Sequence, residues 1–275
     1  MKKYIRALSI AGFDGSGGAG IQADLKTFSA LNCYGMTVLT SLPIQNTIGV
    51  SKIYDLPIES IAEQISSIIE DIGVDVIKIG MLHKSEIIEI VHNKLTEYSM
   101  IPIITDPVMF AKSGDLLLQK VALVSLKSKI LSISTIITPN IYEAQYLSGL
   151  KIISKNDMIT AAKKISVYGS KFIVMKGGHL EQGEDCWDLL YDCESQKSNW
   201  FSNKRIKTKN LHGTGCTFSA AIASYVGNKF SIYDSVENAN LYINKAIESG
   251  SKYKLGKGSG PVDHFYFIEK TNATN

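Results

Sequence analysis

The chain has 275 residues, 45% of them hydrophobic, and a formal net charge of +3 at pH 7. Such a chain can form one large α/β domain, and its mild, scattered positive charge argues against nucleic acid and membrane surfaces as partners. The four cysteines show no C-x-x-C spacing, and no apolar run approaches the roughly 20 residues that span a bilayer. We therefore expect a cytoplasmic protein with reduced thiols, with a single domain over residues 1–268 and a disordered tail over residues 269–275.

The first predicted elements are a buried strand over residues 7–11 and a helix over residues 21–31, with the glycine-rich stretch "GFDGSGGAG" between them. Gly15, Gly17 and Gly20 satisfy the G-x-G-x-x-G pattern of dinucleotide-binding loops. Such loops also require an acidic residue about 20 positions later to bind the ribose, and "YGMTVLTSLPIQN" contains none. The glycine pattern alone therefore does not establish a dinucleotide site.

Asp14 and Asp24 flank these glycines. Two carboxylates beside a pyrophosphate would be unfavourable, so the loop better suits a neutral or cationic polar ring that carries amino or hydroxyl donors. The alternative is structural, with Asp14 as a turn residue and Asp24 as a partner of the helix dipole. Farther along, Gln45 and Asn46 follow a strand, and a glutamine amide can pair with both a ring nitrogen and an exocyclic amine.

Helices and buried strands alternate along the rest of the chain. Apolar residues at helical spacing predict a helix over residues 58–72, and the run "VDVIKIG" after it predicts a buried strand. The same pattern recurs where "KSEIIEIVHNKLTEY" precedes "IPIITDP" and where "ISKNDMITAAKKISVYG" precedes "KFIVMKGG", with the apolar run "STIITP" between them. Continuous strand hydrophobicity predicts an α/β fold with a mostly parallel central sheet and helices on both faces. Residues 185–208 break the pattern and predict a small antiparallel edge.

The stretch "NLHGTGCTFSAAIASYV" predicts a helix that begins at about Thr214. Gly213 and Gly215 allow backbone amides to turn inward, and these amides with the helix dipole form an anion site suited to a terminal phosphate. The alternative is an ordinary helix start. Cys216 lies in the first turn, where the helix N-terminus is expected to lower the pKa of its thiol and make it a proton acceptor; the alternative is a small buried cysteine.

Three further polar residues lie at predicted strand ends. Asn140 and Glu143 are three apart at a helix start, which fits either an N-cap with a glutamate at the third position or water-mediated binding of Mg²⁺. Lys176 ends a strand and precedes two glycines, so its ammonium can reach phosphate oxygens; the alternative is a solvated lysine in a turn. Because ligands bind beyond the carboxyl ends of parallel strands, we expect these groups to lie together.

Eight stretches of the chain together resemble the hydroxymethylpyrimidine/phosphomethylpyrimidine kinases of the ribokinase-like superfamily. They are "AGFDGSGGAGIQADLKTFSAL", "YGMTVLTSLPIQNTIGV", "IKIGML", "DPVMFAKSGD", "ITPNIYEA", "KGGHL", "HGTGCTFSAAIA" and "GKGSGPVDHF", in the family's order from about residue 7 to 267. The resemblance implies a ribokinase-like fold, a homodimer and Mg²⁺. It also implies ATP-dependent phosphorylation of 4-amino-5-hydroxymethyl-2-methylpyrimidine and then of its monophosphate, in thiamine biosynthesis.

The resemblance also implies roles for individual residues. It places Gly12, Asp24, Gln45 and Met81 around the pyrimidine, with Gln45 as the principal recognition residue. It makes Gly213, Thr214, Gly215 and Cys216 the anion hole, with Cys216 as the base, Lys176 and Asn140 the contacts to the ATP phosphates, and Asp106 with Glu143 the acidic side of the Mg²⁺ site.

The first loop departs from the family pattern A-G-[Ser/Thr]-D-P-[Ser/Thr]-G-G-A-G. Phe13 and Gly15 stand where the family has a hydroxyl residue and a proline. Gly15 is more flexible than proline and completes the G-x-G-x-x-G pattern, which we therefore interpret as a coincidence of this substitution. Phe13 and Gly15 therefore affect the rigidity of the loop and its fit to the substrate ring.

Three other functions compete with this kinase. A pyridoxal kinase on the same scaffold is the first, although the sequence from Gln45 to Thr47 favours a pyrimidine. A nucleotide- or vitamin-binding regulator without turnover is the second, and the presence of Cys216, Lys176 and Glu143 together argues against it. A dehydrogenase is the weakest, because the ribose-binding acid is missing.

Overall fold

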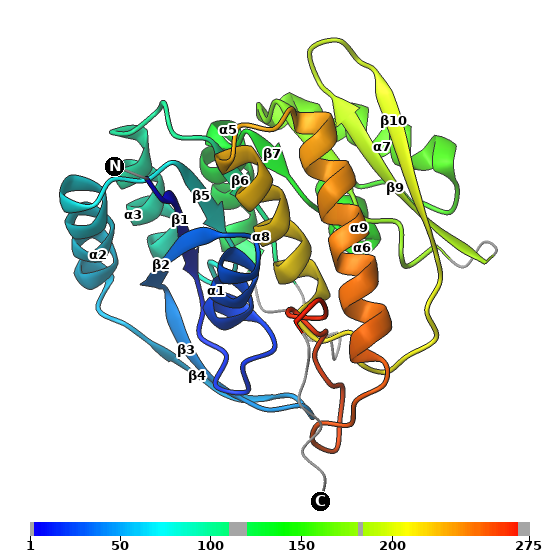
Figure 1. The fold of residues 1–275 in the computed structure, drawn as a ribbon. Coiled ribbons are helices and arrows are strands. Elements are labelled where there is room, and N and C mark those ends of the chain that lie inside the picture. The colour runs from blue at the N-terminus through cyan, green and yellow to red at the C-terminus, as the bar shows by residue number, and fades with distance from the viewer. Residues whose placement is uncertain (1–2, 110–119, 181–183, 269–275) are drawn as a thin grey trace, which may run out of the picture.

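An eight-stranded sheet runs through the molecule (Figure 1), in the order β10-β9-β8-β7-β6-β5-β1-β2. The computed structural model describes residues 3–109, 120–180 and 184–268. The parallel strands are β1 (Ile5–Ala11), β2 (Cys33–Leu39), β5 (Val76–Ile79), β6 (Ile103–Thr105), β7 (Ile136–Ile137) and β8 (Phe172–Met175). Two antiparallel strands, β9 (Asp185–Asp192) and β10 (Ser198–Lys204), complete one edge. The predicted mostly parallel sheet and its antiparallel edge are confirmed.

Both faces of the sheet are covered, as the continuous apolar runs predict. Successive strand side chains point to opposite faces, so Val76 and Ile104 join one apolar cluster while Ile77 and Ile79 join the other. On the first face pack α1 (Gly20–Ala30), α8 (Thr214–Gly227) and α9 (Ile232–Gly250). On the second pack α2 (Ile58–Asp71), α3 (Ser85–Thr96), α4 (Lys120–Ser125), α5 (Leu131–Ile133), α6 (Ile141–Ser148) and α7 (Lys155–Ile165).

Most predicted element boundaries agree with the structure within a few residues, and α8 begins at Thr214 as expected. The sequence did not indicate the π-helical turn over Leu126–Ile130 or the short 3-10 turn over Ser166–Tyr168. The predicted tail, 269–275, and residues 110–115 of the "DPVMFAKSGD" stretch lie outside the described residues. Within the described part of the chain, no helix is both long and apolar enough to cross a bilayer.

A separate two-stranded ribbon, β3 (Ser41–Gln45) with β4 (Val50–Asp55), extends from the end of β2 (Figure 1). Its tip is bound to the glycine-rich loop near the C-terminus: the amide of Ser259 donates to the Thr47 carbonyl at 2.8 Å, and that of Gly258 to the Thr47 hydroxyl at 3.1 Å. A Cβ on Gly258 would lie only 1.9 Å from the Thr47 carbonyl oxygen. The glycine therefore allows the ribbon and the C-terminal loop to close one end of the site.

Candidate active site

A cavity of about 1220 Å³ opens at the carboxyl ends of the parallel strands. It is lined by loops that follow β1, β5, β6, β7 and β8, by the ribbon, and by the first turn of α8. The predicted site residues that line it are Gly12, Gln45, Met81, Asp106, Asn140, Glu143, Lys176, Gly213, Thr214, Gly215 and Cys216. The fold thus brings into one cavity predicted site residues that are up to 204 positions apart in the sequence (216 − 12).

Two glycine-rich loops meet at the wall of this cavity. Gly213 has a φ of +77°, and a Cβ there would lie 1.7 Å from the carbonyl oxygen of Gly18. A Cβ on Gly18 would in turn lie 2.4 Å from the His212 ring. Both positions therefore require glycine, because the first loop packs directly against the start of α8.

Asp14 holds the first loop in shape. Its carboxylate accepts hydrogen bonds from the amides of Gly18 (3.1 Å) and Ala19 (2.7 Å) and forms a hydrogen bond of 2.8 Å with His212 Nε2. Burial acts to raise the pKa of Asp14, but hydrogen bonds from His212, Ser16 and Gln45 lower it well below its usual range. Amides that a pyrophosphate would need are already bound to this carboxylate, which agrees with the coincidental origin of the G-x-G-x-x-G pattern. The turn role considered for Asp14 is the one the structure shows.

The two residues that depart from the family pattern lie against each other. A Cβ on Gly15 would be 3.1 Å from the Phe13 ring, and Phe13 lines the cavity. The amide of Phe13 donates to the carbonyl of Ser41 at 3.0 Å, which ties the loop to the start of the ribbon. The aromatic ring therefore occupies the space next to the glycine, where a larger residue would have to displace it.

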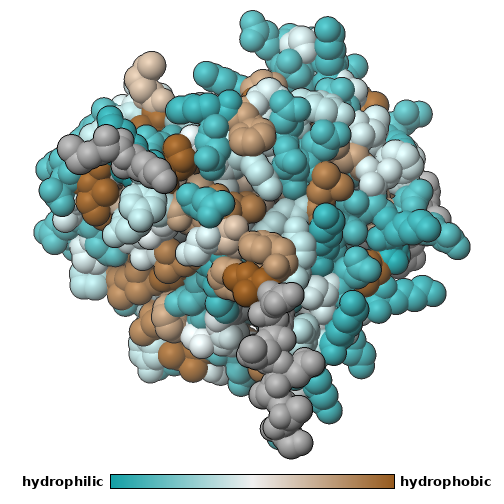
Figure 2. All heavy atoms as spheres, in the orientation of Figure 1, coloured by the Kyte–Doolittle hydropathy of each residue, from teal (hydrophilic) through white to brown (hydrophobic). Residues whose placement is uncertain are grey.

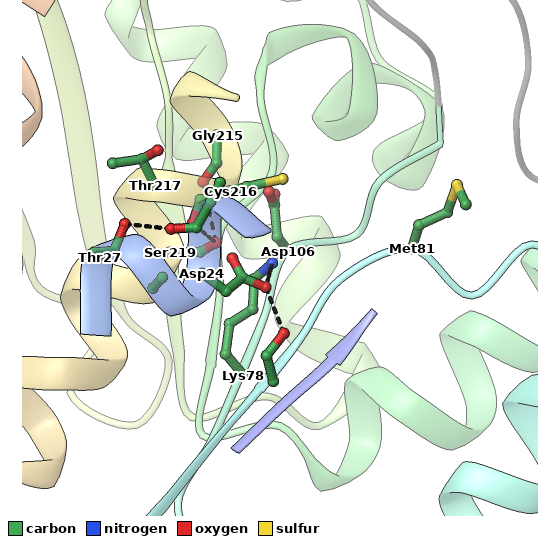
Figure 3. A network of polar contacts seen from close by, with 12 residues as sticks. Asp24, Thr27, Lys78, Met81, Asp106, Gly215, Cys216, Thr217 and Ser219 are labelled. Atoms are coloured by element: carbon green, nitrogen blue, oxygen red, sulfur yellow. Dashed lines mark hydrogen bonds and ion pairs between the residues drawn. The ribbon is translucent and has the colours of Figure 1, made fainter. Parts of the chain in front are cut away.

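Asp24 does not line the cavity, which corrects the prediction that it contacts the pyrimidine. It has no exposed surface, and its Oδ2 accepts from Lys78 at 2.8 Å and from the Ser9 hydroxyl at 2.5 Å. Lys78 is also fully buried but contributes to the lining of the cavity, so the ion pair lies directly below the cavity surface and is shielded from water. Figure 3 shows it close to Cys216 and Asp106. The sequence signal that was missed is a lone lysine in the otherwise apolar strand "VDVIKIG".

The environment of Cys216 also differs from the prediction. Burial raises the pKa of its thiol to about 11, with Asp24 and Asp106 adding to the effect, while Lys78 and the Gly20 amide oppose it. The expected lowering by the helix N-terminus is therefore wrong, since desolvation of the thiolate outweighs the helix dipole. The thiol nonetheless lines the cavity at the first turn of α8.

Lys176 and Asp106 form the polar centre of the cavity. The lysine ammonium lies 2.7 Å from Asp106 Oδ1, which also accepts from the Thr138 hydroxyl at 3.2 Å. A Cβ on Gly215 would be 3.3 Å from the Lys176 ammonium and 3.2 Å from Asp106 Oδ2. Burial acts to lower the pKa of Lys176, but Asp106 and Glu143 raise it above its usual value. The lysine is therefore a fixed positive charge beside the start of α8.

Asn140 and Glu143 form the N-terminal capping box of α6. The Glu143 amide donates to the Asn140 side chain at 2.9 Å, and the Asn140 amide donates to the Glu143 carboxylate at 2.8 Å. Burial raises the pKa of Glu143 to about 7, and Asp106 adds to the rise. The capping alternative is thus present, and both residues line the cavity as well.

The acidic groups fit Mg²⁺ only in a water-rich mode. Among the residues that the structure describes, no cluster of three or more His, Cys, Asp or Glu side chains can hold a metal ion. Asp106 and Glu143 supply two carboxylates beside Lys176. Mg²⁺ bound to nucleotide phosphates commonly uses one or two carboxylates and keeps several of its waters, so these two residues suit that role.

Comparison with known proteins identifies the family. The phosphomethylpyrimidine kinase family model matches residues 14–263. The hydroxymethylpyrimidine/phosphomethylpyrimidine kinase of Escherichia coli is 42% identical over 265 residues, which cover 96% of this chain and 98% of that protein. The thiamine biosynthesis bifunctional protein ThiED of Geobacter sulfurreducens is 42% identical over 262 residues, 95% of this chain, and the chain spans 52% of its length.

Solved structures give the same result for the fold. The phosphomethylpyrimidine kinase of Clostridium difficile superimposes with a TM-score of 0.79 at 40% identity, covering 89% of this chain and all (100%) of that one. The pyridoxal kinase of Staphylococcus aureus, in complex with AMP-PCP and pyridoxal, gives a TM-score of 0.86 at 34% identity, covering 97% of this chain and 95% of that one. The predicted fold and family resemblance are confirmed: the chain belongs to the phosphomethylpyrimidine kinase family.

Proposed function

We propose that this chain transfers the γ-phosphoryl group of ATP to the hydroxymethyl oxygen of 4-amino-5-hydroxymethyl-2-methylpyrimidine, and then phosphorylates the monophosphate, in thiamine biosynthesis. One observation carries the proposal. A single cavity connects a pocket around Gln45 to the first turn of α8 and to Lys176. An alcohol bound in that pocket lies next to groups that stabilise a transferring phosphoryl group.

The pocket at the ribbon suits a small flat ring. A Cβ on Gly12 would lie 2.8 Å from the Met81 methyl and 2.9 Å from the Ser41 hydroxyl, so the glycine allows these two side chains to pack directly against the first loop at the wall of the pocket. The half-buried Gln45 amide at the end of β3 can pair with a ring nitrogen and the exocyclic amine of an aminopyrimidine. Met81 supplies an adaptable apolar contact.

The centre of the cavity suits the phosphates. The first amides of α8 lack intrahelical partners and favour an anion, as does the helix dipole. The Lys176 ammonium adds a full positive charge, and Asn140 lies beside it through a backbone bridge. Cys216, in the same turn of α8, takes the proton of the attacking hydroxyl in its ionised, thiolate form. Mg²⁺ would neutralise charge on the phosphate oxygens, with Asp106 and Glu143 on its acidic side.

The far end of the cavity suits the nucleoside. It lies between β10 and α9 and combines isoleucines with amide side chains: Asn203, Ile206, Asn240, Ile243, Asn244 and Ile247. Apolar surfaces on which a flat base can pack, together with a few polar groups that fix its orientation, are typical of cofactor and nucleotide sites.

Assembly as a homodimer and action in the cytoplasm stay predictions. In support of the first, apolar side chains of the ribbon are exposed, with Ile44 at 47%, Ile48 at 69% and Tyr54 at 47%. Figure 2 shows apolar patches on the part of this face where β2 and the ribbon lie in Figure 1. In support of the second, all four cysteines are free.

The alternative favoured by a specific observation is pyridoxal phosphorylation, because pyridoxal kinases superimpose closely on this chain. The test is to incubate the purified chain with ATP and Mg²⁺ and with either the hydroxymethylpyrimidine or pyridoxal, and to compare kcat/KM for the two alcohols. We expect the hydroxymethylpyrimidine to be the better substrate and its monophosphate to be converted further. A larger kcat/KM for pyridoxal would overturn the assignment in favour of the pyridoxal kinase, and tight binding of ATP without turnover of either alcohol would support a regulator.

A further inference from the structure

A chain of polar side chains links the Lys176 turn to the nucleoside end of the cavity. Asp188 on β9 accepts from the Gly177 amide at 2.8 Å through Oδ1 and from the Asn240 side chain at 2.7 Å through Oδ2. Asn240 on α9 in turn accepts from the Asn203 side chain at 2.5 Å. Asp188, Asn240 and Asn203 all line the cavity, and none of them was singled out by the sequence. The proposed mechanism of phosphoryl transfer does not use this chain of contacts.

The carboxylate sets the direction of every hydrogen bond in this chain. An ionised aspartate can only accept, so its two oxygens require donors from Gly177 and from Asn240. The amide of Asn240 must then turn its oxygen toward Asn203, and Asn203 must donate to it. An amide in place of the carboxylate at position 188 would allow the opposite direction, in which the oxygen and nitrogen atoms of both asparagines exchange places.

The other end of the chain fixes the backbone next to Lys176. A Cβ on Gly177 would lie 1.9 Å from the carbonyl oxygen of Trp187, so this turn packs directly on β9. Arg205 supports the residues that follow, donating to the carbonyls of Gly178 at 2.7 Å and Leu180 at 2.6 Å. The Asp188 carboxylate accepts the hydrogen bond of the Gly177 amide. Gly177 directly follows Lys176, the lysine that faces the phosphates.

We propose that Asp188 is a positioning residue for ATP: it holds the turn that presents Lys176 and, through Asn240 and Asn203, fixes which polar atoms face the nucleoside. This role depends on the proposed function in one respect, which is that the nucleotide is ATP. The charge on Asp188 is compatible with it. Burial raises the pKa of Asp188 to about 6, while the Gly177 amide, Lys176 and Asn240 oppose the rise, so the group is mostly ionised at neutral pH.

Four variants separate the effect of Asp188 on the Gly177 turn from its effect on the orientation of Asn240 and Asn203. Asp188→Ala removes the acceptor for the Gly177 amide. Asp188→Asn retains an acceptor there but reverses the chain. Asn240→Asp places a second carboxylate against Asp188. In the double variant Asp188→Asn/Asn240→Asp, the amide at position 188 accepts from Gly177 and donates to the carboxylate at position 240, which accepts from Asn203. The bond from Asn203 thus regains its original direction, while the bond between positions 188 and 240 is reversed. Asp185→Asn, an exposed carboxylate on the same strand, is the matched control.

The measurements are AMP-PCP binding by calorimetry, steady-state kinetics for ATP and for the alcohol, and melting temperature. For Asp188→Ala we expect kcat/KM for ATP to fall roughly 5- to 150-fold, the effect of leaving a buried donor unpaired, with KM for the alcohol unchanged. For Asp188→Asn we expect weaker AMP-PCP binding with kcat retained. The double variant should bind AMP-PCP more tightly than either single variant, and Asp185→Asn should match the wild type.

Three outcomes would overturn the role: a double variant no better than both single variants, equal losses for ATP and the alcohol, or losses that follow melting temperature alone. If the wild-type chain did not bind AMP-PCP, the proposed function would fail and this role with it. If it bound AMP-PCP and turned over, but Asp188→Ala matched the wild type, only the role of Asp188 would be wrong.

Discussion

The protonation of Cys216 gives the sharpest test of the proposed chemistry. With burial raising the pKa of the thiol to about 11, only about one thiol in a thousand is ionised at pH 8, since each pH unit below the pKa lowers the ionised fraction about tenfold. If the thiolate accepts the proton of the hydroxyl, the rate of the first phosphorylation should rise about tenfold for each pH unit between pH 7 and pH 9. A thiol with a lowered pKa would instead reach a plateau within this range.

The perturbation is Cys216→Ser, because a serine hydroxyl does not ionise at these pH values. We expect a loss of about 10²–10⁴-fold in turnover, the usual effect of removing a general base, and a pH profile without the steep rise. ATP affinity should be retained, because the backbone amides of the anion site stay in place. Cys186→Ser is the matched control, since Cys186 lines the same cavity and should leave both the rate and its pH dependence unchanged.

The assay is single-turnover phosphorylation of the hydroxymethylpyrimidine at saturating ATP and Mg²⁺ across pH 6.5 to 9.5. This substrate carries no phosphate, so its own ionisation does not produce the expected slope. A plateau below pH 8.5 in the wild type would show that the burial argument is wrong. A Cys216→Ser variant within about tenfold of the wild type, with the same slope, would show that Cys216 does not act as the base.

Three other substitutions test separate parts of the site. Gln45→Ala should weaken pyrimidine binding by about 1–3 kcal/mol, because a polar partner is left unpaired, with little change for ATP; equal losses for both ligands in calorimetry would reject this recognition role. Glu143→Gln preserves the capping box but removes the charge, so it should raise the Mg²⁺ concentration that gives half-maximal activity, and an unchanged Mg²⁺ dependence would leave Glu143 as a helix cap only. Gly213→Ala places a Cβ 1.7 Å from the Gly18 carbonyl oxygen at a φ of +77°. It should lower the melting temperature by roughly 4 °C or more and abolish ATP binding. A variant with wild-type melting temperature and turnover would contradict the close approach of the two loops.

The layered fold follows from local sequence patterns. A strand covered on both faces is apolar on both, and β5 shows this because Val76 and Ile77 face opposite clusters, with Lys78 as the exception in that strand. The helix at Thr214 is predictable for a similar reason, since small residues precede a continuous run of helix formers. The ribbon was not predicted, because its strands pair only with each other and expose much of their surface, so that their sequence lacks the apolar pattern of a buried strand.

The site was predictable where the position of a residue along its element determines where it points. Lys176 directly follows a strand and Cys216 lies in the first turn of a helix, and the carboxyl ends of parallel strands converge whatever the details of packing. The pairing of Asp14 with His212, 198 residues away, was not predictable. The pairing of Asp24 with Lys78 and the chain from Asp188 were not predictable either, because each depends on side chains from separate elements.

By itself, the sequence determined the fold class, the family, and most of the residues that line the cavity. The tertiary structure decided their electrostatics. The helix N-terminus predicted a lowered pKa for Cys216, but the pKa is raised because the thiol is half-buried and lies near Asp24 and Asp106. The sequence around Asp24 would look the same for a ligand-binding aspartate and for one that neutralises a buried lysine. Only the complete burial of Asp24 beside Lys78 distinguishes these two roles. Desolvation depends on everything packed around a charged group, and neighbours along the chain supply only a small part of that packing.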